Sequence, residues 1–253
     1  MKLLRHITDQ PGTPGTLPAL LCLWVALCIS GAVEAQETSP LKPSTDGELW
    51  MSISGSYQPF KKKGHKYSSQ PLLGKLQFQS DLGWRATLEP FTSKQVYGTF
   101  GAKLRLTDFL RVGSEYRYSA RDKYSSNTSR IDLQLWLNWT KDRVRLDHRF
   151  MYQHDFVDVT KVRSVLRNRL TVEYNIPGWK LDPHFSAEAF TGLHYTGNDL
   201  VGMRYELGTE LDLDKKKTRS LEVAVRYGQE LHTANPQNRW IFVVAYGHEF
   251  KKK

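Results

Sequence analysis

The chain contains few cysteines, and beyond its N-terminal region it has no long apolar stretch. Both cysteines, Cys22 and Cys28, lie within the first 35 residues. A disulfide framework is therefore excluded for the rest of the chain, which has to be stabilised by other means. After residue 35 no segment approaches the 18 or so consecutive apolar residues that a membrane-spanning helix needs, and helical periodicity is nearly absent. The sequence thus excludes a helical span and a helical domain in this part of the chain.

The first 35 residues resemble an export signal. Lys2 and Arg5 give a positive start, the apolar run LPALLCLWVALCISGAV follows at 17–33, and Val33-Glu34-Ala35 resembles a small-residue cleavage site. We predict a signal peptide at 1–35 that is removed after Ala35. An N-terminal membrane anchor is the alternative, because the apolar run is close to the shortest length that spans a bilayer.

Most of the positive charge of the chain is not gathered into runs. Its 36 lysines and arginines exceed the 26 acidic residues by ten, but most of them stand singly between apolar residues. A nucleic-acid-binding surface needs a basic run or patch, so we expect no nucleic-acid partner. Metal-ligand spacings, phosphate-binding loops and dinucleotide-binding motifs are also missing from the sequence. We therefore predict no catalytic residues, no metal site and no cofactor.

What the chain does contain is strict alternation. In RVRLDHRFMY, at 143–152, charged residues occupy the odd positions from 143 to 149 and Met occupies 151, while Val, Leu, His, Phe and Tyr occupy the even positions. A period of two is typical of an extended strand with two different faces. The lengths of such segments, mostly nine to thirteen residues, match tilted membrane strands and exceed the usual five or six of soluble sheets. The alternation predicts eleven strands, at 48–58, 75–89, 96–106, 110–118, 131–139, 143–152, 162–174, 181–189, 201–211, 221–227 and 240–250.

The segments between these strands alternate in predicted length. Short turns are expected at 107–108, 140–142, 175–179 and 212–218, and longer polar loops at 119–130, 153–161, 191–199 and 228–238. In outer-membrane barrels the short turns are periplasmic and the long loops extracellular. Aromatic residues near the strand ends predict girdles at the two membrane interfaces; these are Tyr116, Tyr118, Trp139, Tyr152, Tyr174, Tyr227, Trp240, Tyr246 and Phe250.

We therefore predict an all-β fold, an up-and-down antiparallel transmembrane β-barrel in the bacterial outer membrane. The barrel is expected to occupy 48–250, between an N-terminal segment at 36–47 and a basic tail at 251–253. Bacterial single-chain barrels normally have an even number of strands, so we expect twelve, with the twelfth hidden in 60–74 or 36–47, and ten as the fallback. A soluble barrel with its apolar face inside is the alternative.

In a membrane barrel the charged face lines the interior, and here its charges are biased along the chain. The earlier strands are expected to form a basic wall of Lys103, Arg105, Arg111, Arg117, Arg143, Arg145, Arg149, Arg163, Arg167 and Arg169. The later strands are expected to form a facing acidic wall of Asp182, Glu188, Glu206, Glu210 and Glu222. This arrangement favours a small channel that prefers anions. The alternative is a non-conducting structural or interaction barrel whose ion pairs fill the interior.

One constellation combines an acid, a base and a nucleophile. His184, Ser186 and Glu188 share one face of the strand predicted at 181–189. These residue types can form a hydrolytic relay, so an enzyme that modifies envelope lipid is a weaker alternative. Polar triplets on the inner face are, however, common in any such barrel.

From about residue 96 onward the chain resembles a family of bacterial outer-membrane barrels known as domain of unknown function 2490. The resemblance rests on LRVGSEYRY at 110–118, VLRNRLTVEYNIPGWKLDPHFSAEAF at 165–190, GMRYELGTELDLDKKKTRSLEVAVRYGQE at 202–230 and the terminal aromatic strand. It implies an outer-membrane location and a barrel fold, without an established activity. The partners expected are outer-membrane lipid, small anionic solutes and the barrel-assembly machinery, which would contact the C-terminal strand.

Overall fold

A computed structural model describes residues 43–62, 64–65, 67–121, 125–156, 164–194, 197–233 and 235–250. The predicted signal peptide, residues 36–42 of the N-terminal segment, Arg163 and the tail at 251–253 lie outside the described residues. Within the described residues, no helix has both the length and the apolar character needed to cross a membrane.

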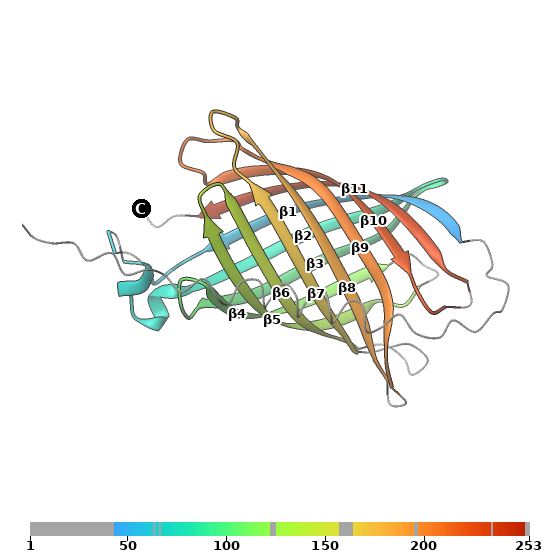
Figure 1. The fold of residues 1–253 in the computed structure, drawn as a ribbon. Coiled ribbons are helices and arrows are strands. Elements are labelled where there is room, and N and C mark those ends of the chain that lie inside the picture. Colours follow the sequence, from blue (N-terminus) through green and yellow to red (C-terminus); the bar gives the residue numbers. More distant parts are fainter. Residues whose placement is uncertain are drawn as a thin grey trace, which may run out of the picture. The chain divides into compact units, whose positions relative to one another are not determined.

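The described residues form eleven strands in one closed barrel (Figure 1). Each strand overlaps one of the eleven segments predicted from alternation, so the all-β fold is confirmed. Except for those predicted at 75–89 and 162–174, which are two residues shorter, the strands are longer than predicted, because they extend into the neighbouring polar segments. They are β1 (Ser44–Tyr57), β2 (Leu76–Leu88), β3 (Phe91–Arg105), β4 (Leu110–Arg121), β5 (Thr128–Lys141), β6 (Val144–Phe156), β7 (Ser164–Tyr174), β8 (Leu181–His194), β9 (Gly197–Asp212), β10 (Arg219–Glu230) and β11 (Gln237–Phe250).

The barrel closes through a parallel pair of strands. β1 pairs with β11 over its whole length, from Ser44 opposite Gln237 to Tyr57 opposite Phe250, whereas every other pair of neighbours is antiparallel. The prediction of twelve strands is wrong. The segment 60–74 contributes two short 3-10 helices, η1 (Tyr67–Ser69) and η2 (Leu72–Lys75), and residues 44–47 extend β1. With an odd number of strands, the first and last necessarily run in the same direction, and a parallel ladder satisfies their backbone groups.

The two ends of the barrel differ less than the sequence predicted. We call the end where β11 finishes the C-end; it carries the connections 58–75, 106–109, 142–143, 175–180 and 213–218. At the opposite N-end the strand boundaries leave 89–90, 122–127, 157–163, 195–196 and 231–236 between consecutive strands; 122–124, 157–163, 195–196 and 234 lie outside the described residues. The expected contrast between short turns and long loops is absent from these strand boundaries, because the strands extend into the loops. The longest connection, 58–75, in fact lies at the end that was expected to carry only short turns.

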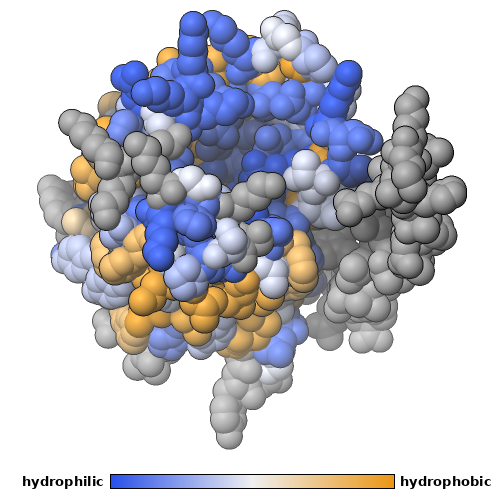
Figure 2. Space-filling view, turned by 90° about the vertical axis from the view of Figure 1, so that its left-hand side faces the viewer, coloured by the Kyte–Doolittle hydropathy of each residue, from blue (hydrophilic) through white to orange (hydrophobic). Residues whose placement is uncertain are grey.

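The barrel has a polar interior and an apolar outer surface, which is the reverse of a soluble globular protein. Among the described residues, six hydrophobic side chains are buried against ten that are polar or charged, and Glu206 and Asp132 are among the most completely buried. Large hydrophobic side chains such as Ile53, Leu82 and Leu207 are exposed, each by 60% or more. Figure 2 looks into the C-end and shows a hydrophilic hollow, with hydrophobic residues on the outside of the wall.

A small apolar patch lies inside the barrel, next to its parallel seam. Ala224, Ile241 and Val243 are buried together on β10 and β11, and Trp50 of β1 packs against them. The seam is therefore supported by side-chain packing as well as by its backbone ladder.

Candidate functional site in the barrel interior

The barrel encloses two cavities that meet inside it. One, of about 520 Å³, extends from the N-end into the middle of the barrel, and the other, of about 490 Å³, lies toward the C-end. Four side chains line both cavities, namely Gln79, Lys103, Glu115 and Arg117. The two hollows are therefore adjacent stretches of one polar interior.

The two cavities carry opposite charge. The larger, which we call the basic cavity, is lined by ten lysines and arginines and five acidic residues. The smaller, which we call the acidic cavity, is lined by three lysines and arginines and five acidic residues. The basic set is Arg85, Lys103, Arg117, Arg130, Arg149, Arg167, Arg169, Arg204, Arg226 and Arg239. Charge is thus segregated along the barrel axis.

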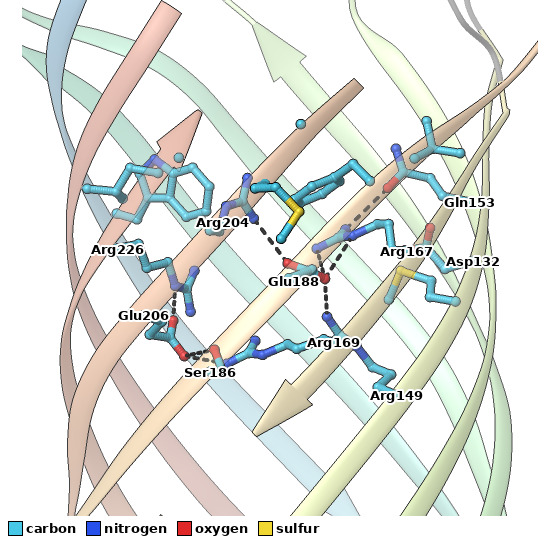
Figure 3. A pocket seen from close by; sticks show the side chains of 18 of the residues that line it. Asp132, Arg149, Gln153, Arg167, Arg169, Ser186, Glu188, Arg204, Glu206 and Arg226 are labelled. Atoms are coloured by element: carbon cyan, nitrogen blue, oxygen red, sulfur yellow. Dashed lines mark hydrogen bonds and ion pairs between the residues drawn. The ribbon is translucent and has the colours of Figure 1, made fainter. Parts of the chain in front are cut away.

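Glu188 lies at the centre of one arginine cluster (Figure 3). Its Oε1 accepts hydrogen bonds from Arg149 Nη2 at 2.9 Å and from Arg167 Nε and Nη2 at 3.1 and 2.9 Å. Its Oε2 lies 3.6 Å from Arg204 Nη1. The Glu188 side chain is only 3% exposed, so a single buried carboxylate is shared by three guanidiniums from β6, β7 and β9.

Glu206 is the centre of a second cluster, also visible in Figure 3. It forms ion pairs with Arg169 of β7 and Arg226 of β10. It also lies 3.3 Å from His184 Nε2 and accepts a 3.5 Å hydrogen bond from Ser186 Oγ. Together, the two buried carboxylates face five arginines, which leaves this wall with an excess of positive charge.

Three further guanidinium contacts converge on Trp50. The Cζ of Arg85 lies 3.7 Å from the indole centroid, and those of Arg204 and Arg226 lie 5.3 and 5.5 Å from it. These separations are within the range of cation–π attraction. We call Trp50, Arg85, Arg204 and Arg226 the Trp50 arginine cluster. It brings β1, β2, β9 and β10 together in the basic cavity.

Tyr97 continues this arrangement around the wall. Its ring lies 5.1 Å from the Cζ of Arg85 and 4.2 Å from that of Arg117. Gly83 is paired with Tyr97 in the ladder, and a Cβ at this glycine would come within 2.1 Å of the Tyr97 ring. The missing side chain at Gly83 therefore allows the ring to lie against β2, between two arginines.

The predicted basic residues are distributed differently from one continuous wall. Lys103, Arg117, Arg149, Arg167 and Arg169 line the basic cavity. Arg145 bridges Asp147 and Glu173 at 2.8 and 3.3 Å, and Arg105 bonds to the backbone oxygen of Asp108 near the C-end. Arg111 shares the inward face of β4 with Arg117. Arg143 is exposed in the turn between β5 and β6, not within a strand.

The predicted acidic residues do not form a separate facing wall. Glu188 and Glu206 are paired with arginines of the basic cavity, whereas Glu210 lines the acidic cavity. Glu222 lies 3.9 Å from His184, and Asp182 is half-buried at the C-end start of β8. The expectation of a basic wall facing an acidic wall is therefore replaced by a basic stretch and an acidic stretch along the axis.

The nine predicted girdle residues have the opposite parity to most of the cavity-lining residues of their strands, which places them on the outer face. Seven of them are exposed, and Tyr227 and Tyr246 are half-buried. His148 is also on this outer face, where its ring lies 4.2 Å from that of Phe150 and Nε2 contacts Asn168 Oδ1. A polar group on this face is thus paired with a neighbour.

The acid, base and nucleophile types at 184–188 do not form one relay. His184 and Ser186 both contact Glu206, while Glu188 is held by its three arginines. Sequence reasoning missed the half-buried Arg85 and the aromatic partners Trp50, Tyr97 and Phe190. The Phe190 ring centroid lies 4.9 Å from the Cζ atoms of Arg167 and Arg204. The alternation of 75–89 places Arg85 on the polar face, but cation–π partners on other strands depend on register and side-chain reach.

A comparison with known protein families identifies the family of this chain. The profile of the family described as a protein of unknown function (DUF2490) matches residues 48–240. The chain belongs to this family. Among curated proteins none matches the chain. The resemblance expected from the sequence is therefore confirmed, and the matched region runs from β1 into β11.

Proposed function

We propose that this DUF2490 chain is a transmembrane barrel of the bacterial outer membrane that lets small anions pass. The observation that carries the proposal is the reversed polarity, with charged groups buried inside and large apolar side chains exposed outside. In water such an outer surface would be an aggregation liability, whereas in a bilayer it faces lipid. On this proposal lipid contacts the outer face, and the assembly machinery contacts the aromatic outer face of β11.

The anion preference rests on the basic cavity and its connection to the acidic one. A cavity with twice as many basic as acidic residues concentrates anions at low ionic strength. Lys103 lines both cavities, and its Nζ lies 4.7 Å from the ring centroid of Trp136. Because Lys103 stands where the two stretches meet, its charge acts on any ion that crosses. The proposal includes no catalytic step, since Glu188 is occupied by arginines.

Single-channel recording in planar bilayers under a salt gradient tests the proposal. The reversal potential should show that anions are more permeant than cations, and Lys103→Gln should reduce that preference. Arg143→Gln is the matched control, because it also removes one positive charge, but from an exposed turn, and it should change the selectivity little. A cation preference, or an equal effect of the two substitutions, would contradict the proposed pathway.

A non-conducting barrel is the second candidate, and one observation favours it. Side chains reach over intervening strands, as Arg149 of β6 does to Glu188 of β8 and Gln79 of β2 does to Glu115 of β4. Such bridges narrow the interior, and a barrel of this size is intermediate between filled and open ones. A closed trace at all voltages, from protein that migrates as a folded barrel on unheated gels, would establish this candidate.

A further inference from the structure

Arg85 stands apart from the arginines around it. Among the described residues it forms no hydrogen bond or ion pair, and its Nε is buried without a hydrogen-bond partner. Its contacts are with the faces of Trp50 and Tyr97 instead. A buried cation without a counter-charge is unfavourable unless an anion is close by.

The other two arginines on Trp50 are only partly neutralised. Arg204 shares Glu188 with two further arginines, at the longest of the three separations, 3.6 Å. Arg226 shares Glu206 with Arg169. Three guanidinium carbons thus lie within 5.5 Å of one indole centroid. The carboxylates around them, Glu48, Glu188 and Glu206, are each shared with other basic residues. Like charges gathered around one ring repel one another, so an anion bound among them would stabilise the cluster.

The Trp50 ring that these guanidiniums contact is held in place by its neighbours. The indole Nε1 of Trp50 donates a 2.6 Å hydrogen bond to Glu48 Oε2, and the ring packs against Ala224, Ile241 and Val243. A guanidinium stacked on an aromatic face keeps its N–H edge available, and that edge matches the geometry of an oxyanion. A cavity of about 520 Å³ also has the size of a small-molecule site.

We propose that the Trp50 arginine cluster is a binding site for a compact oxyanion, the carboxylate or phosphate group of a small solute. The proposal rests on the proposed function in that the solute reaches the cluster through the aqueous interior. Arg85 supplies a charge that forms no ion pair among the described residues, and Arg204 and Arg226 supply the flanking donors.

Equilibrium binding to the full-length mature chain, folded in detergent at low ionic strength, tests the site. Citrate and inorganic phosphate are titrated separately, with calorimetry and tryptophan fluorescence as readouts. We expect saturable binding of at least one probe, which identifies the preferred group, and Trp50→Phe should remove the fluorescence change. Arg85→Gln should raise the Kd about tenfold or more, as expected for the loss of a charged hydrogen bond.

Arg111→Gln is the matched control. Arg111 also shows no hydrogen bond or ion pair among the described residues and has a buried Nε without a partner, but it lines neither cavity. Its substitution should leave the Kd unchanged. If Arg85→Gln fails to fold, Arg85→Lys keeps the charge, loses the planar fork and should still weaken binding.

Two results would overturn the site. One is the absence of saturable binding of either probe to the folded wild-type chain, and the other is an equal loss of affinity in the Arg85 and Arg111 variants. A failure of the binding site can be distinguished from a failure of the proposed channel function. A barrel that binds citrate but never conducts would refute the channel alone, and one that conducts anions without saturable binding would refute the site alone.

Discussion

Replacing Glu188 by glutamine should destabilise the barrel strongly, because it removes the carboxylate that three arginines share. A pair of opposite unit charges 4 Å apart is worth about 4 kcal/mol at an effective dielectric constant of about 20. Desolvation offsets much of that attraction, but removing one partner of a buried ion pair leaves uncompensated charge and costs about 3–5 kcal/mol. Here the glutamine would leave the charges of Arg149, Arg167 and Arg204 facing one another.

Urea unfolding of the barrel in detergent, followed by tryptophan fluorescence, measures this effect. With an m-value of about 3 kcal/mol per molar urea, a loss of about 3 kcal/mol lowers the midpoint by about 1 M. Glu210→Gln is the control, since Glu210 is exposed in the acidic cavity and should change stability by less than about 0.5 kcal/mol. Equal midpoints for the two variants would refute the reasoning that Glu188 neutralises the cluster.

Three further predictions address the wall, the outer face and one turn. Gly83→Ala should cost about 1–3 kcal/mol in unfolding free energy, because its Cβ would overlap Tyr97, whereas Gly98→Ala, with no atom within 4 Å of its Cβ, should not. Leu207→Arg should lower the free energy of unfolding, measured with urea, by about 2–4 kcal/mol if this outer position faces lipid. If the position faces water, the free energy of unfolding should stay nearly unchanged. In the turn at 213–218, hydrogen bonds from Thr218 and Arg219 hold the pKa of Asp214 at about 2, below the usual 3.8. Its contribution to turn stability should therefore be intact above pH 4 and be lost as the pH falls through 2; an NMR titration midpoint near 3.8 would contradict this.

The alternation of side chains was sufficient to predict the strands and their faces. In 143–152 the even residues lie on the outer face and Arg145 and Arg149 face inward, because a strand has only two faces and a slip of one residue would exchange them. The same rule placed all nine predicted girdle residues outside. It failed for Arg143, since alternation continues into the turn at 142–143 and does not mark where hydrogen bonding between β5 and β6 begins.

The number of strands in the barrel could not be predicted from the alternation of side chains. Alternation predicts eleven segments, and the expectation of a twelfth rests only on the usual even counts of such barrels. Whether a barrel closes depends on whether its first and last strands can pair, which is a property of segments almost 200 residues apart. The continuous parallel register from Ser44–Gln237 to Tyr57–Phe250 satisfies both edges and removes the need for another strand.

The arrangement of charge inside the barrel is a second feature that could not be predicted from the sequence. Position along the chain tells which strand carries a residue, and parity tells which face, but neither tells its height along the axis. Height is set by strand tilt and register. Arg85 and Arg117, 32 residues apart, both contact the ring of Tyr97, whereas Lys103 on the same strand as Tyr97 contacts Trp136 nearer the C-end. Strand order therefore predicted two walls, while register assembles a basic stretch toward the N-end and an acidic stretch toward the C-end. On the proposed function, an ion that crosses this interior meets the two stretches in series. The basic cavity, which has five more basic than acidic residues, is then the stretch that should determine which ions pass.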